Sequence, residues 1–89
     1  MDRCEIRKIV SLKLKLVRVE AGFTQSSMSQ MIGLSKKTLV QIEKGRLVAG
    51  WSTAVTVCAL FSESRILRTA LEDSPIKVIK RLGFNEWEQ

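Results

Sequence analysis

Residues 24–45, "TQSSMSQMIGLSKKTLVQIEKG", decide the fold, because this short stretch carries the start and stop signals of two helices. Thr24 and Ser35 each follow an apolar residue and precede a helical pattern, so each hydroxyl is predicted to cap a helix N-terminus. Gly33 and Gly45 stand where the two helices are predicted to end. The residues predicted to face inward are Met28, Met31, Ile32, Leu39 and Ile42. The sequence therefore predicts two short helices joined by a tight turn.

The segment before Thr24 alternates leucine with lysine over residues 12–16, a pattern that is also typical of a half-buried strand. Projection on a helix explains the alternation, because two apolar stripes then run along residues 5–21, about 140° apart. The stripe predicted to face the core consists of Ile6, Val10, Leu14, Val17 and Ala21. The second stripe consists of Ile9, Leu12, Leu16 and Val19. A regular pattern of this length favours a helix over a strand, and Gly22 is predicted to end it.

Three more helices are predicted in the second half of the chain. One is expected to start at Ser52 as its N-cap, and the next lies within residues 62–74. The sixth has Ser74 as N-cap, Pro75 as its first residue and Gly83 as its stop signal.

A chain of 89 residues has the size of one domain with a single modest core. We expect residues 1–62 to form that core and residues 63–89 to form a helical extension of the same domain. Phe84 and Trp87 are expected to hold the end of the extension against the rest of the protein.

Positive charge is concentrated in the first half of the chain. The net charge is +6. Residues 1–50 hold ten Lys and Arg against four Asp and Glu, whereas residues 51–89 hold five of each kind. This asymmetry favours an acidic partner, first a nucleic acid and second an anionic membrane or acidic protein; a merely solvated basic face is the alternative.

Several functional classes are not expected from this composition. No apolar run approaches the roughly 20 residues that span a bilayer, and the N-terminus does not resemble a signal peptide, so we expect a cytoplasmic protein without membrane contact. The chain has no histidine, and Cys4 and Cys58 lack metal-ligand spacing, so no metal, cofactor or disulfide is expected. An enzyme is not expected either, because the usual acid–base and nucleophile-activating residue sets are missing.

Residues 14–45, "LKLVRVEAGFTQSSMSQMIGLSKKTLVQIEKG", have helix-turn-helix spacing and resemble the Cro/phage-repressor (XRE-type) helix-turn-helix family. The resemblance rests on the joint spacing of its marks: Arg18, Gly22, Thr24, Gln25, Gly33, Ser35, Ile42 and the whole of "IEKG" at 42–45. It implies an all-α fold, a lambda-repressor-like bundle of five helices, here followed by the C-terminal extension. It also implies sequence-specific binding of double-stranded DNA by a transcriptional regulator that acts as a repressor.

The resemblance implies that the third helix enters the major groove, with Lys36, Lys37 and Gln41 at the base-reading positions. The residue types suit that role, because lysine donates to guanine, glutamine pairs with adenine, and Thr38 on the same side can contact a thymine methyl. Two lysines at a helix N-terminus interact unfavourably with the helix dipole, at a cost of about 0.3–1 kcal/mol each, and a nearby phosphate would compensate that cost. The alternative is that these lysines are simply a solvated first turn.

The resemblance implies four contacts to the DNA backbone, which position a protein without reading sequence. The residues at those positions are Thr24, Gln25, Lys44 and Arg46. In the family the glutamine at position 25 also braces the reading helix.

The resemblance gives Arg18 and Glu43 a structural role, as an ion pair between the first and third helices. A carboxylate beside DNA would repel phosphates, so Glu43 is expected to be engaged inside the protein. Loss of one partner of such a buried pair would cost about 3–5 kcal/mol.

The second stripe, Ile9, Leu12, Leu16 and Val19, exceeds what a minimal domain of this kind needs. Either residues 62–83 fold back over it or another protomer covers it, and we expect residues 62–83 both to cover it and to build a dimer contact. Members of the family commonly bind two half-sites roughly 34 Å apart as two-fold dimers.

Two alternative functions use the same fold. One is an antitoxin whose C-terminal helices bind a toxin while the basic half represses the operon; an anti-repressor is another conceivable protein partner. The other is a protein-binding adaptor without DNA affinity, which the basic side chains of the third helix and the following loop argue against.

Overall fold

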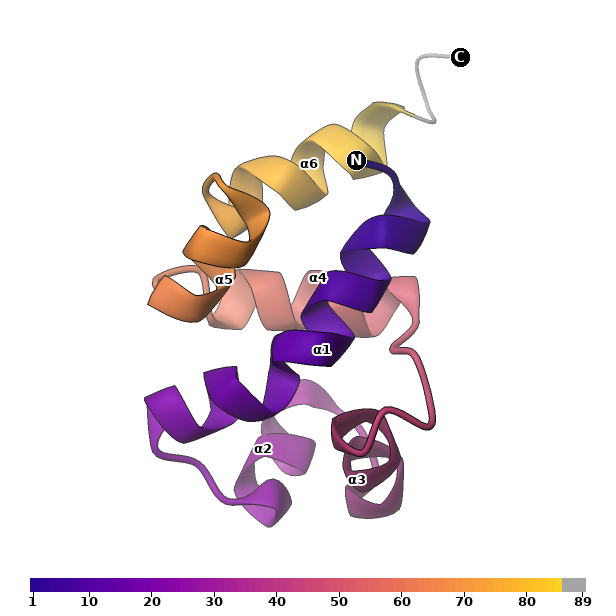
Figure 1. The fold of residues 1–89 in the computed structure, drawn as a ribbon, viewed down its shortest axis with the longest axis vertical. Coiled ribbons are helices and arrows are strands. Elements are labelled where there is room, and N and C mark those ends of the chain that lie inside the picture. The colour runs from indigo at the N-terminus through magenta and orange to yellow at the C-terminus, as the bar shows by residue number, and fades with distance from the viewer. Residues whose placement is uncertain (86–89) are drawn as a thin grey trace.

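The computed structural model describes residues 1–85, and within them the chain folds into six α-helices (Figure 1). They are α1 (Arg3–Ala21), α2 (Gln25–Ile32), α3 (Lys36–Glu43), α4 (Trp51–Leu60), α5 (Arg65–Leu71) and α6 (Pro75–Asn85). α2 and α3 form one end of the molecule and α6 forms the other, with α1 running between the two ends (Figure 1). This arrangement confirms the expected all-α, lambda-repressor-like bundle.

The boundaries of α1, α2 and α3 follow from local sequence signals. Thr24 and Ser35 accept hydrogen bonds from the amides of Ser27 and Thr38, at 3.1 Å each, so both predicted N-caps are confirmed. Gly22 and Gly33 adopt left-handed conformations, with φ of 79° and 77°, directly after α1 and α2. A turn of only three residues, 33–35, therefore separates α2 from α3.

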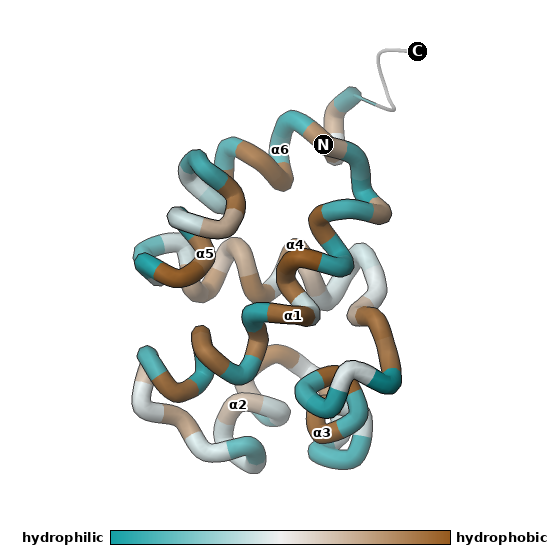
Figure 2. The backbone as a smooth tube through the Cα atoms, viewed as in Figure 1, coloured by the Kyte–Doolittle hydropathy of each residue, from teal (hydrophilic) through white to brown (hydrophobic). Residues whose placement is uncertain are grey.

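The core forms around α1, against which α3, α4 and α5 pack (Figure 1). Ile6, Val10, Leu14 and Val17 are completely buried, whereas Ala21 at the end of the predicted inner stripe is exposed. Figure 2 shows hydrophobic segments of α1 and α4 meeting in the middle of the molecule. Burial of each such side chain contributes about 1.5–3 kcal/mol, so this one face accounts for a large part of the folding free energy.

Some sequence predictions about helix ends and burial were wrong. α4 begins one residue before the expected cap, with Gly50 rather than Ser52 at its N-cap and no side-chain capping bond. Gly83 lies inside α6, which continues to Asn85. Met31 is 44% exposed instead of buried.

The predicted anchoring of the C-terminal end is not seen at Phe84, whose side chain is 63% exposed. Trp87, the other residue expected to take part, lies outside the described residues.

The expectation that residues 62–83 cover the second stripe of α1 was also wrong. Leu12, Leu16 and Val19 are 77%, 49% and 60% exposed, and Ile9 is only partly buried. α5 has just seven residues and points Leu67 into the core, so it borders the stripe without crossing it. α6 packs instead on α4 and α5. Whether the stripe contributes to a dimer stays a prediction.

No helix within residues 1–85 is long and apolar enough to cross a membrane.

Candidate nucleic-acid interface

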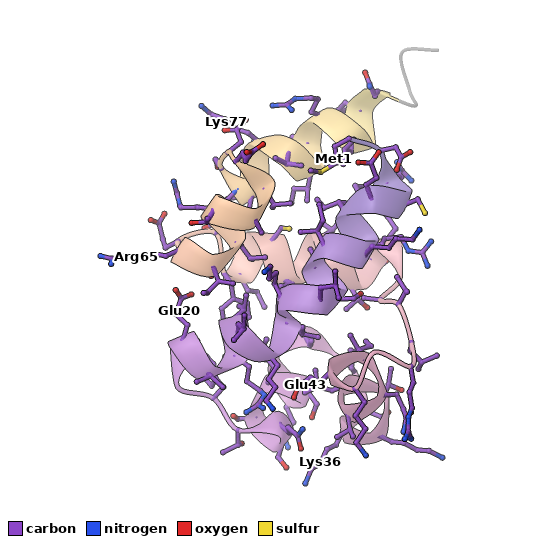
Figure 3. The ribbon with its side chains drawn as sticks, in the orientation of Figure 1. Met1, Glu20, Lys36, Glu43, Arg65 and Lys77 are labelled. Carbon is purple, nitrogen blue, oxygen red and sulfur yellow. The ribbon has the colours of Figure 1, made fainter. Side chains whose placement is uncertain are left out.

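α3 turns a polar edge outward at the end of the molecule opposite α6. Lys36 and Lys37 are exposed, and Lys36 points away from the body of the protein (Figure 3). Thr38 lies in the same first turn and Gln41 in the next one, and both are partly exposed. Among residues 1–85 no hydrogen bond or ion pair engages the side chains of Lys36, Lys37 or Gln41, so all three are available to a ligand.

The sequence of α3 fixes which side faces outward. Leu39 and Ile42, three residues apart, are 0% and 3% exposed and anchor the opposite side of the helix in the core. Ser35 fixes the first turn: its hydroxyl accepts from the Thr38 amide and donates to the Thr38 hydroxyl, at 3.1 and 2.9 Å. The four candidate base-reading side chains are thereby held on one rigid helical turn and a half, a suitable platform for contact with base edges.

Glu43, the last residue of α3, joins three helices. Its carboxylate accepts from Arg18 of α1 at 2.7 and 3.0 Å, in bidentate geometry, and from the Gln25 side-chain amide of α2 at 3.2 Å. Arg18 also donates to the carbonyl oxygen of Phe23, in the α1–α2 connection, at 3.1 Å. The side chains of Arg18 and Glu43 are only 13% and 4% exposed, and Glu43 points inward between α1 and α3 (Figure 3). This cluster fixes the relative positions of the first three helices.

Burial by itself would raise the pKa of the Glu43 carboxyl. Hydrogen bonds from Arg18 and Gln25, followed by the positive charges of Arg18 and Lys15, outweigh it and hold the pKa below its usual range. The hydrogen bond between Arg18 and Glu43 also raises the pKa of the Arg18 guanidinium. Glu43 is therefore ionised at neutral pH and its charge is internally compensated, as a protein face that approaches phosphate requires.

The loop after α3 is clamped to α1 through both backbone groups of one residue, Ala49. The amide of Ala49 donates to the Ser11 hydroxyl at 2.8 Å, and the Ala49 carbonyl accepts from the Arg7 guanidinium at 2.8 Å. Ser11 in turn donates to the backbone carbonyl of Arg7 at 2.6 Å. Sequence reasoning missed this clamp; the available signal was a serine and an arginine at the border of the buried stripe of α1.

The same loop carries two exposed cations beside the end of α3. Lys44 and Arg46 are exposed, and within the described residues neither forms an ion pair. The amides of Arg46 and Leu47 both donate to the carbonyl oxygen of Gln41, at 2.9 and 3.3 Å. The loop is thus fastened to α3 at one end and to α1 at the other, so its cations have a defined backbone position.

The N-terminus of α2 lies at the same end of the molecule as α3 (Figure 1). Thr24 is exposed, and its hydroxyl and that of Ser27 cap each other's backbone amides in a reciprocal capping box. Gln25 is partly buried, and its amide group already donates to Glu43. The structure thus places Gln25 against α3, as the bracing role requires, with one amide hydrogen left for an external acceptor.

Within residues 1–85 no group of three or more His, Cys, Asp or Glu side chains could hold a metal ion. Cys4 is exposed and Cys58 is buried, and both are free thiols. The chemistry that this region offers is donation of hydrogen bonds and positive charge.

Comparisons with known proteins agree with this geometry. A family model described as helix-turn-helix matches residues 14–49, which contain α2, α3 and the clamped loop. An uncharacterized HTH-type transcriptional regulator of Bacillus subtilis (strain 168), YgzD, is 32% identical over 50 residues, which is 56% of this chain and 76% of that protein. No solved structure matches the chain with comparable significance. The chain therefore belongs to the Cro/phage-repressor (XRE-type) helix-turn-helix family of DNA-binding proteins.

Proposed function

We propose that this protein is a transcriptional regulator, acting as a repressor in the cytoplasm, that binds a specific double-stranded DNA sequence with α3 in the major groove. The observation that carries the proposal is the polar edge of α3, where lysine and glutamine side chains stand free of internal partners on a rigid helix. The excess positive charge of residues 1–50 supports the same partner.

Base reading is assigned to Lys36, Lys37, Thr38 and Gln41. The two lysines occupy the first turn of α3, where their charge opposes the helix dipole and a nearby DNA phosphate would compensate it. Lysine suits the acceptors of guanine, and the free amide of Gln41 suits the donor and acceptor of adenine.

Contacts to the DNA backbone are assigned to Thr24, Gln25, Lys44 and Arg46. Lys44 and Arg46 supply charge from the clamped loop, and the capped N-terminus of α2 supplies backbone amides and its positive dipole end. Such contacts contribute affinity at every sequence and fix the position of α3 in the groove.

Two copies are proposed to bind two half-sites as a homodimer, with the C-terminal helices α5 and α6 at the contact. Half-sites for such an arrangement lie roughly 34 Å apart, or one turn of DNA. Sedimentation of the protein with a duplex that contains a full site should give two protein chains per duplex.

Selection of bound duplexes from a random pool tests the proposal directly. We expect enrichment of one short motif, arranged as an inverted repeat, and an affinity that falls steeply with salt concentration. A pool that stays random after several rounds, or no association at low ionic strength, would contradict the proposed function.

A further inference from the structure

The outer face of α1 carries an apolar stripe, Ile9, Leu12, Leu16 and Val19, that no described residue covers beyond the partial burial of Ile9. Successive members are separated by three, four and three residues, which is the spacing of the a and d positions of a coiled coil. Leu12 is 77% exposed, directly opposite the side of α1 that is buried in the core. The stripe therefore has the form of a seam that packs against one further helix.

Hollows on both sides of the apolar stripe would receive side chains of that helix. On one side a hollow of about 300 Å³ lies between Leu12 and the clamped loop, where Leu47 and Val48 are each about half exposed. On the other side a hollow of about 230 Å³ lies between Leu16 and Ile66 of α5. The stripe and the two hollows thus bring exposed apolar side chains of α1, the clamped loop and α5 onto one face of the protein.

Positive charges border this surface. Lys8 lines the first hollow, and Lys13 and Arg65 line the second; Arg65 projects outward from α5 (Figure 3). Of the acidic groups near the stripe, Glu43 pairs with Arg18 and Glu20 accepts a hydrogen bond from the Ser64 hydroxyl, while Glu5, one turn before Ile9, is exposed. The chemistry complementary to this face is an apolar helix edge flanked by carboxylates.

A second copy of the same face fits less well. With two α1 helices parallel in this heptad register, Lys8 of one copy would face Lys13 of the other, while Lys15 and Glu20 would attract each other. With the helices antiparallel, Lys8 would face Lys15, while only Lys13 and Glu20 would attract each other. Each pairing of two copies thus places two lysines opposite each other, whereas an acidic helix would place carboxylates opposite these lysines.

We propose that the outer face of α1 is a docking site for an acidic amphipathic helix of a partner protein. The helix lays its apolar edge along the stripe, places side chains in the two hollows, and sets glutamates or aspartates opposite Lys8, Lys13 and Arg65. This surface borders the loop that carries Lys44 and Arg46, but none of the residues assigned to DNA contacts lines either hollow, so the proposal does not depend on the DNA sequence that is read.

Two stapled helical peptides of about 18 residues provide the probe. Both carry leucine at the a and d positions; one carries glutamate and the other lysine at the e and g positions. We expect the acidic peptide to bind with micromolar affinity, and the basic peptide to bind about tenfold more weakly or worse, by fluorescence anisotropy. Amide shift changes in ¹⁵N spectra should centre on Leu12, Leu16 and Val48.

Matched variants separate docking from folding. Leu12→Glu should lower the affinity for the acidic peptide at least about tenfold. Leu60→Glu, which changes another exposed leucine, on α4, should leave that affinity unchanged. Both side chains are exposed, so both variants should keep the parent melting temperature. The double variant Lys8→Glu, Lys13→Glu should reverse the preference and bind the basic peptide more tightly.

Equal affinity for the two peptides, or no binding of either, would overturn the proposal. So would sedimentation that shows a dimer of this protein that Leu12→Glu abolishes, because the occupant of the face would then be a second copy.

Discussion

At the scale of single residues, one carboxylate carries much of the architecture behind the interface. Glu43 receives hydrogen bonds from Arg18 and Gln25, and so connects α1, α2 and α3 at a point shielded from solvent. The resemblance to a known family suggested both the pairing of Arg18 with Glu43 and the bracing of α3 by Gln25. The Arg7–Ser11 clamp on Ala49 was missed, because its partners lie about 40 positions apart in the sequence and depend on how the loop after α3 packs on α1.

Replacement of Glu43 by glutamine should lower the free energy of unfolding by about 3 kcal/mol at pH 7, because Arg18 is then left largely buried without a counter-charge. The pKa of Glu43 is lowered in the folded state, so its contribution is complete above the unfolded-state pKa and is lost as the pH falls through the folded-state value. The difference between Glu43→Gln and the parent should therefore shrink in acid. Urea denaturation at pH 7 and pH 3 measures it, and an equally stable variant at pH 7 would refute the structural role.

The two cysteines should differ sharply in reactivity. Burial raises the pKa of the Cys58 thiol to about 11, so almost none of it is thiolate at neutral pH, whereas Cys4 is exposed on the first turn of α1. Iodoacetamide at pH 8 should label one site, Cys4, in the native protein and both sites after denaturation. Rapid native labelling of Cys58, detected by peptide mass analysis, would show that α4 does not seal this side of the core.

At the scale of helices, local signals fixed most boundaries in advance. Thr24 and Ser35 cap their helices and Gly22 and Gly33 end theirs, because capping depends only on residues within one turn. The failures came where packing overrides the local signal. Gly83 carries no left-handed backbone and stays within α6, where it lies against the Trp51 ring.

Two glycine exchanges test this view of helix ends in opposite directions. Gly33 has a φ of 77° with open space around its Cα, so Gly33→Ala should cost about 1 kcal/mol through backbone strain alone. Glu72 ends α5 at a φ of 58° without being glycine, so Glu72→Gly should stabilise the protein by up to about 0.5–1 kcal/mol.

Thermal unfolding of both variants beside the parent gives the comparison. A Gly33→Ala protein as stable as the parent would mean that the turn between α2 and α3 adopts another backbone conformation at little cost. The fixed position of α3 would then need another explanation.

At the scale of the whole molecule, the two proposed binding functions lie on different parts of the surface. The end formed by α2 and α3 is polar and basic, whereas α4 and α5 pack on α1 and α6 packs on α4 and α5 at the opposite end (Figures 1 and 2). The composition indicated the basic half, but it did not show that the second stripe of α1 remains open. Exposure of the stripe depends on where the short helix α5 packs against α1, and no local pattern in residues 62–74 specifies that position.

Each face should respond independently to substitution. Leu12→Glu on α1 should leave affinity for a selected DNA site within about twofold of the parent, because Leu12 is not on the proposed DNA-binding edge of α3. Electrophoretic mobility shifts at one fixed salt concentration measure this. A large loss of DNA affinity would indicate that the apolar stripe takes part in the DNA-bound assembly.

The central claim is that the outward edge of α3 reads bases while the loop beside it holds the DNA backbone. The most direct test measures the affinities of Gln41→Ala and Lys44→Ala for a selected site and for every single-base variant of it. The account predicts that Gln41→Ala costs about 1–3 kcal/mol and relaxes discrimination at one base position. It predicts that Lys44→Ala weakens all sequences alike and reduces the salt slope by about one unit. Identical behaviour of the two variants across all sequences would contradict it.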